Sequence, residues 1–282
     1  MSNHSKRLLF GTILVSGCCL LLCWDLSSSK GFGLGILVAL FSTVSFVELA
    51  RMMNLGGVPT TLGVAIVWTL PTMVLLGVEN LSAFDRPGVV AILIPLGPLL
   101  VWSLRRGGNE PRGLFSSRPA PLIGALWIGA PLACLLEMAT STEVGVHSVL
   151  WLLLVVKGND SGAYLIGRRF GKTPLSSLSP KKTVEGALGG LLVGGAIGYG
   201  YFQFVPIVPL GPLGAMLMAI SMGVCGQLGD LVESGVKRAL GVKDSGRLVP
   251  TYGGALDMVD SLLLASPVLL LVIKTLEDSW SS

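Results

Sequence analysis

The chain has 282 residues, of which 51% are hydrophobic and only 13% are charged, and its formal net charge is +4. An ordinary soluble domain carries about 25% charged residues, so this composition excludes that class and indicates a protein that crosses a membrane several times. Only two histidines are present, which argues against a histidine triad or a histidine-ligated metal. The five cysteines lack the paired spacing of a zinc site.

Nine apolar runs follow one another along the chain, and each is long enough for a transmembrane helix. A helix needs roughly 20 apolar residues to cross a bilayer, and backbone groups in lipid must be satisfied within their own segment. We therefore predict an all-α, polytopic integral membrane protein with nine helices, at approximately 8–24, 32–50, 60–78, 88–104, 120–139, 146–166, 187–205, 213–228 and 255–276.

The distribution of lysine and arginine predicts an orientation. With the N-terminus in the cytoplasm, most of the 20 basic residues fall in segments on that side, as the positive-inside rule requires. We predict an N-in, C-out topology in the cell inner membrane, with a polar site at the cytoplasmic side of the C-terminal helices. Residues 1–282 are interpreted as one integral-membrane domain, with apolar N-terminal helices (1–145) and a C-terminal catalytic half (146–282).

Glycine recurs every four residues in the seventh predicted span, at Gly190, Gly194 and Gly198. Small residues at this spacing let two helix backbones approach closely. The stripe therefore predicts a helix-packing face.

A first polar segment, residues 157–186, begins inside the sixth predicted span. Asn159 and Asp160 interrupt that span, where a polar pair requires water, a partner or an ion. Tyr164 follows Asp160 by four residues, so the two share a helical face. The pair is a candidate part of a polar pocket.

Further along this segment, Ser179 and Pro180 predict an N-cap and a first helical position. Lys181 and Lys182 would then occupy the first turn, where the helix dipole disfavours cations. A phosphate bound at the helix start would remove that conflict. The alternative is that both lysines extend toward lipid headgroups.

A second polar segment, residues 229–260, holds carboxylates, cations and glycines between the last two predicted spans. If the eighth helix continues past its apolar run, Asp230, Glu233, Ser234 and Lys237 share one face because they follow helical spacing. Charged groups near a bilayer are expensive unless paired, hydrated or bound to an ion. This segment is therefore a functional-site candidate.

Asp257 and Asp260 lie three residues apart at the start of the ninth predicted span. Together with Asp230 they form a candidate divalent-cation site, since Mg²⁺ prefers oxygen ligands and commonly shares them with substrate phosphates. The alternative for Asp257 and Asp260 is helix capping. Between the two helices, the segment 244–246 is typical of a turn, and Gly253 and Gly254 of a flexible start to the following helix.

Three sequence blocks resemble those of phosphatidate cytidylyltransferases, also called CDP-diacylglycerol synthases. They are NDSGAYLIGRRFGK from Asn159, SPKKTVEG from Ser179, and S-x-x-K-R-x4-K-D-S-G-x3-P-x-x-G-G-x-x-D-x-x-D from Ser234 to Asp260. The resemblance implies transfer of CMP from CTP to phosphatidic acid, giving CDP-diacylglycerol and pyrophosphate. It also implies a requirement for Mg²⁺, with K⁺ as a candidate second ion, binding to the lipid bilayer but not to nucleic acid, and a homodimer.

Carried onto this sequence, the resemblance implies three groups of residues. The metal ligands would be Asp230, Asp257 and Asp260, which with Lys237 and Lys243 would form the catalytic set. The substrate-binding residues would be Asn159, Asp160, Lys181, Lys182, Ser234, Arg238, Asp244, Gly253 and Gly254.

Two positions depart from the family pattern: Tyr252 stands where the family usually has His, and Met258 where it usually has Arg. Methionine cannot contact a phosphate as Arg does. Two alternatives stay open, a CTP-dependent enzyme that acts on another lipid phosphate and an ion-coupled transporter in which Asp160 and Asp230 relay cations. The clustering of acids at one membrane face disfavours the transporter.

Overall fold

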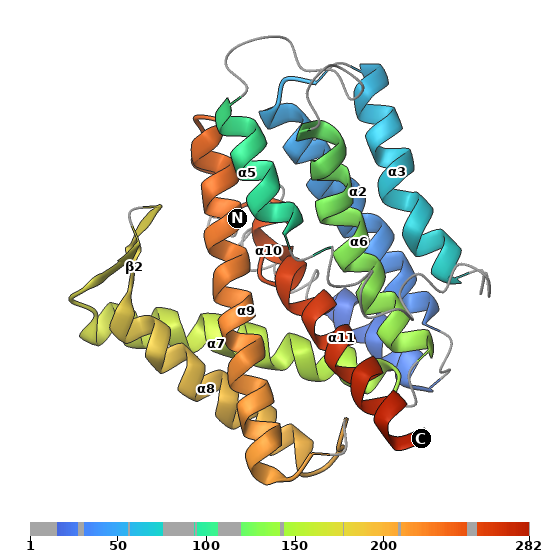
Figure 1. The fold of residues 1–282 in the computed structure, drawn as a ribbon, viewed down its shortest axis with the longest axis vertical. Coiled ribbons are helices and arrows are strands. Elements are labelled where there is room, and N and C mark those ends of the chain that lie inside the picture. The colour runs from blue at the N-terminus through green and yellow to red at the C-terminus, as the bar shows by residue number, and fades with distance from the viewer. Residues whose placement is uncertain are drawn as a thin grey trace, which may run out of the picture.

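The computed structural model describes residues 16–27, 31–55, 57–75, 93, 95–106, 120–141, 144–176, 178–207, 210–246 and 253–281. Figure 1 shows that these residues form helices and one short β hairpin. In chain order the elements are a helix at Ser16–Ser27, α2 (Phe32–Met52), α3 (Gly57–Leu75), α5 (Leu96–Arg106), α6 (Ala120–Ser141), α7 (Val146–Phe170), β1 (Pro174–Ser176), β2 (Ser179–Thr183), α8 (Val184–Phe202), α9 (Pro212–Ala239), α10 (Ala255–Val259) and α11 (Leu262–Ser281).

Five helical segments of the described chain are long and apolar enough to cross a membrane. They are α2, most of α6, α7, α9, and α10 together with the first part of α11, and they match the second, fifth, sixth, eighth and ninth predicted spans. The predicted helical membrane protein is confirmed at this level. The helix at Ser16–Ser27 lies at the first predicted span, whose residues 8–15 are outside the described residues, and α3, α5 and α8 lie at the third, fourth and seventh. A count of nine membrane crossings stays a prediction.

Helix α6 is the centre of the N-terminal half of the structure. It contacts α2, α3, α5 and α11, and most of its apolar part is buried inside the structure. Side chains from α2 and α6, including Phe46, Leu49, Ile128 and Leu136, fill the core between these helices. This apolar bundle supports one side of the polar site.

Helices α7 and α8 form a closely packed pair that lies across α9 (Figure 1). A Cβ atom on Gly190 would lie 2.6 Å from the carbonyl oxygen of Asn159, and one on Gly194 would lie 2.8 Å from that of Val155. One on Gly198 would lie 2.6 Å from a Val155 methyl group. The predicted packing role of the glycine stripe is confirmed, and the face it packs against is α7 of the same chain.

The predicted helix start at Ser179 and Pro180 is wrong. These residues open β2, which pairs with β1 in an antiparallel hairpin that projects from the α7 and α8 pair in Figure 1. Helix α8 begins at Val184, and the Thr183 hydroxyl caps it by accepting a hydrogen bond from the Gly186 N–H at 3.2 Å. The hairpin keeps both lysines out of the positive end of a helix dipole, which removes the predicted conflict.

Helix α9 runs well beyond its apolar part, so the expected common face of its polar residues is confirmed. The ninth predicted span, in contrast, is two helices: α10 ends at Val259 and α11 begins at Leu262. The turn between them consists of Asp260 and Ser261, and we call it the α10–α11 break. This break brings a carboxylate against the side of α9.

Candidate active site

A cavity of about 590 Å³ lies where α7, the β hairpin, α8, α9 and the α10–α11 break meet. Its wall contains both acidic and basic side chains, and the charged ones are Asp160, Arg168, Lys181, Lys182, Asp230, Asp257 and Asp260. Six of these seven were site candidates from the sequence, and Arg168 was not. The two polar segments therefore meet in one space, which suits an anionic ligand accompanied by a cation.

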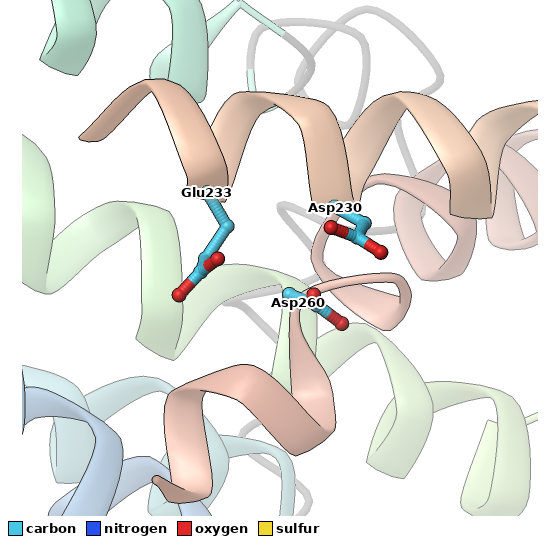
Figure 2. A group of neighbouring side chains, drawn as sticks. All are labelled: Asp230, Glu233 and Asp260. Atoms are coloured by element: carbon cyan, nitrogen blue, oxygen red, sulfur yellow. The ribbon is translucent and has the colours of Figure 1, made fainter. Parts of the chain in front are cut away.

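Three carboxylates converge beside the cavity, and we call them the acidic cluster: Asp230, Glu233 and Asp260. One oxygen from each lies within 4.8 Å of the others. Figure 2 shows Asp230 and Glu233 extending from the same side of α9 toward Asp260 in the α10–α11 break. Glu233 is fully buried and Asp260 is nearly so. Such a cluster could hold a metal ion, because carboxylate oxygens are the ligands that Mg²⁺ prefers.

Glu233 offers the best test of that fit. Its Oε2 lies 2.6 Å from the Nζ of Lys237, yet neither of its oxygens accepts a well-aligned hydrogen bond from the described residues. A buried carboxylate normally satisfies its oxygens with hydrogen bonds or a metal. The chemistry of the acidic cluster fits a divalent cation, and so does the Oε1 of Glu233, which has no hydrogen-bond partner among the described residues. The sequence placed Glu233 on this face without assigning it as a ligand.

Asp257 lies next to the acidic cluster but has other partners. Its Oδ1 accepts a hydrogen bond from Lys237 at 2.7 Å. Its Oδ2 accepts from the Ser245 hydroxyl at 2.9 Å and from the Gly254 N–H at 2.8 Å. The last bond caps the start of α10, which is the alternative that the sequence left open. The role of Asp257 as a metal ligand stays a prediction.

A buried glutamate of the N-terminal half anchors this region. Glu48 on α2 accepts a hydrogen bond from the Leu256 N–H at 3.0 Å and one from the Ser245 hydroxyl at 3.3 Å. Both bonds span about two hundred positions of sequence. Since Ser245 also contacts Asp257, Glu48 connects α2 with both Ser245 and the start of α10. The sequence analysis did not single out Glu48, although a carboxylate inside an apolar span is a signal that could have identified it.

The β hairpin contributes a basic group to the acidic cluster. Lys182 on β2 forms an ion pair and hydrogen bond with Asp230, while Lys181 is exposed at the cavity wall. Glu185 holds the base of the hairpin by accepting hydrogen bonds from the backbone N–H groups of Lys172 and Thr173. These bonds lower the pKa of Glu185 to about 2.

The two polar residues of α7 have different surroundings. Asp160 lines the cavity, and its Oδ2 lies 3.5 Å from the Nζ of Lys157. Asn159 is buried behind the wall, where its Oδ1 accepts a hydrogen bond from Gln227 at 2.9 Å. Gln227 itself lines the cavity. Asn159 therefore does not line the cavity itself but holds Gln227 of α9, a residue that the sequence analysis did not single out.

The other predicted site residues lie outside the cavity wall as far as the structure describes it. Lys243, Asp244 and Arg238 are exposed, and Arg238 donates to the carbonyl oxygen of Val242 at 3.2 Å. Ser234 is half-buried.

Gly253 has a φ of +90°, a conformation that glycine tolerates best. Tyr252 lies outside the described residues. Met258 is half-buried and contributes its carbonyl oxygen to a hydrogen bond with Lys157.

Apolar helices that surround a cavity lined by carboxylates and basic side chains are typical of a membrane protein with a polar site. The sequence model of the cytidylyltransferase family matches residues 5–276. The chain belongs to this family.

Relatives carry a more specific name. The phosphatidate cytidylyltransferase of Bacillus subtilis is 32% identical over 237 residues, which cover 83% of this chain and 86% of that protein. The enzyme of that name from Staphylococcus saprophyticus is 33% identical over 238 residues, which cover 83% of this chain and 89% of that protein. The one from Helicobacter pylori is 40% identical over 137 residues, which cover 48% of this chain and 50% of that protein.

Proposed function

We propose that this protein is a phosphatidate cytidylyltransferase that joins CTP and phosphatidic acid into CDP-diacylglycerol and pyrophosphate. The main support for this proposal is that Lys182 contacts the acidic cluster beside the cavity. Both substrates are phosphates, so their reaction requires neutralisation of negative charge. The names and coverage of the relatives support the same activity.

We propose Asp230, Glu233 and Asp260 as the ligands of Mg²⁺. When bound, this ion supplies neutralisation of the phosphate charge. In place of the ligand role predicted from the sequence, we propose that Asp257 holds Lys237 and the start of α10 in position. Lys237 also contacts Glu233, so it orients one of the proposed ligands. A role for K⁺ rests on the resemblance alone.

The proposed substrate contacts come from the hairpin and α7. Lys181, Lys182 and Arg168 place positive charge in the cavity wall, which suits the triphosphate of CTP and the phosphate of the lipid. A phosphatidate oxygen attacks the α-phosphorus of CTP, a new P–O bond forms, and the bond to the β-phosphate breaks to release pyrophosphate. The attacking phosphate is largely ionised near neutral pH, so this chain needs no general base.

We propose that the cavity faces the cytoplasm, where CTP is made, and that the protein lies in the cell inner membrane with its N-terminus inside. The lysine and arginine distribution supports this orientation. A reporter fused after Ser282 tests it, because N-in topology with nine crossings requires an external C-terminus. A cytoplasmic reporter signal would contradict that topology.

The activity is tested with purified protein, CTP labelled at the α-phosphate, Mg²⁺ and phosphatidic acid. We expect the label to enter CDP-diacylglycerol, and unlabelled pyrophosphate to be released. Parallel reactions with an isoprenoid phosphate instead of phosphatidic acid define the lipid acceptor. If well-folded protein labels only the isoprenoid phosphate, that lipid and not phosphatidic acid is the acceptor. If it labels neither lipid, the proposal is contradicted.

A further inference from the structure

Lys157 lies in α7, within a segment long and apolar enough to cross a membrane. Its Nζ donates hydrogen bonds to the carbonyl oxygen of Met258 at 2.9 Å and to the Oγ of Ser261 at 3.0 Å. It also lies 3.5 Å from the Oδ2 of Asp160. A charge in such a helix is expensive unless it is paired. Lys157 has three polar partners, and two of them flank Asp260.

The α10–α11 break explains why the Met258 carbonyl needs a donor. Across the break, the Asp260 N–H donates to the carbonyl oxygen of Leu256 at 3.0 Å, and the Leu263 N–H donates to that of Asp260 at 3.2 Å. Carbonyl groups at a helix end lose the partner that the next turn would supply. The ammonium of Lys157 takes that place at Met258, so a side chain of α7 holds the end of α10.

Helix α9 also packs against the break. A Cβ atom on Gly229 would lie 2.6 Å from the carbonyl oxygen of Asp260 and 3.3 Å from the Cα of Ser261. The backbone of α9 therefore lies directly against the break. Helix α9 and Lys157 therefore both contact the break, and the Asp260 carboxylate lies beside the other two carboxylates of the acidic cluster.

We propose that Lys157 is a positioning residue: by clamping the α10–α11 break, it holds the Asp260 carboxylate in the acidic cluster. The inference deepens the proposed function, but the ability of the cluster to bind a cation can be measured without any turnover. It assigns Lys157 no contact with substrate.

Two effects of the Lys157 charge on cation binding have opposite signs. As a like charge near the acidic cluster, Lys157 would weaken the binding of a divalent cation. As a clamp it strengthens that binding, because it fixes a ligand in place, and loss of such supporting contacts typically costs 10–100-fold in metal affinity. The sign of the change on removal of Lys157 therefore separates a clamp from a mere neighbouring charge.

The test is Mn²⁺ binding to the full chain in detergent, followed by electron paramagnetic resonance. The proteins are the wild type, Lys157→Met, Lys157→Arg and a control, Arg51→Met, which removes an exposed charge at the end of α2. We expect Lys157→Met to weaken Mn²⁺ binding by about tenfold or more. Lys157→Arg should restore most of the affinity, and the control should match the wild type. Thermal midpoints without metal show which variants are folded.

Folded Lys157→Met protein that binds Mn²⁺ as tightly as the wild type, or more tightly, would overturn the proposal. If Lys157→Met does not fold, Ser261→Ala removes only one partner of the ammonium and should cost about threefold in affinity; unchanged binding there would overturn the proposal as well. A wild type that binds Mn²⁺ with the expected variant pattern but makes no CDP-lipid would contradict the proposed function and leave the clamp in place.

Discussion

Lys182 on β2 and Asp230 on α9 form an ion pair although 48 positions separate them in sequence. The pair joins the β hairpin to the acidic cluster, and both side chains keep some exposure toward the cavity. A lysine that neutralises one carboxylate of the cluster is also placed to meet a phosphate that enters beside it. This relationship links the two polar segments in one site.

Replacement of Lys182 by methionine should lower kcat/KM for CTP by about 100-fold, the scale of losing one preorganised charge partner in an active site. The matched control is Lys172→Met, which removes an exposed lysine whose backbone N–H, but not its side chain, contacts Glu185. Steady-state kinetics with labelled CTP measures both variants. Equal kcat/KM values for Lys182→Met and Lys172→Met would contradict a role for Lys182 in CTP binding.

Glu233→Gln and Asp257→Asn should differ in their dependence on Mg²⁺. Glu233 belongs to the acidic cluster, so its replacement should raise the Mg²⁺ concentration for half-maximal activity by about tenfold or more. Asp257 already accepts three hydrogen bonds, so its replacement should lower kcat with a smaller change in the Mg²⁺ requirement. Activity titrated against Mg²⁺ for both variants measures the difference. A larger rise in the Mg²⁺ requirement for Asp257→Asn than for Glu233→Gln would support Asp257 as the metal ligand that the sequence predicted.

Glu48→Ala should destabilise the protein by about 1–3 kcal/mol, the cost of leaving a buried donor without its acceptor. The donors are the Leu256 N–H and the Ser245 hydroxyl. Thermal unfolding in detergent measures the loss, and Glu48→Gln, which keeps an acceptor oxygen, should retain part of the stability. A Glu48→Ala protein as stable as the wild type would show that α2 does not anchor α10.

Gly194→Ala should destabilise the packing of α7 on α8 by about 1–3 kcal/mol, as overpacking does in other cores. The new Cβ would lie 2.8 Å from a backbone oxygen of Val155, which cannot rotate away. Gly200→Ala is the control in the same helix, since its Cβ would meet nothing within 4 Å. Thermal unfolding of the two variants compares them directly. Equal midpoints would contradict close packing at Gly194.

The sequence was sufficient where a short-range pattern carried the information. The helical spacing of Asp230, Glu233 and Lys237 predicted one face of α9, and the four-residue glycine repeat predicted a close helix contact. Both are confirmed. The apolar runs located the helices for the same reason, because burial in lipid imposes a period and a length that the sequence displays directly.

The sequence was insufficient where tertiary contacts decide the local structure. Ser179 and Pro180 begin a strand because β2 pairs with β1 and directs Lys182 to Asp230, a partner that is remote in sequence. The α10–α11 break lies inside an apolar run, so hydropathy alone predicted one helix.

Glu48 and Lys157 each sit in an apolar helix and act on residues more than a hundred positions away. No spacing in the sequence could indicate those contacts.

The proposed activity and the proposed metal site can be tested in one measurement. Formation of CDP-diacylglycerol from α-labelled CTP and phosphatidic acid is titrated with Mg²⁺ for the wild type and for Asp260→Asn, with folding of both confirmed by thermal unfolding. We expect Mg²⁺-dependent product from the wild type and a loss of about 100-fold or more for Asp260→Asn, which removes a charged ligand of the cluster. Full activity in Asp260→Asn, or no product from folded wild-type protein, would contradict it.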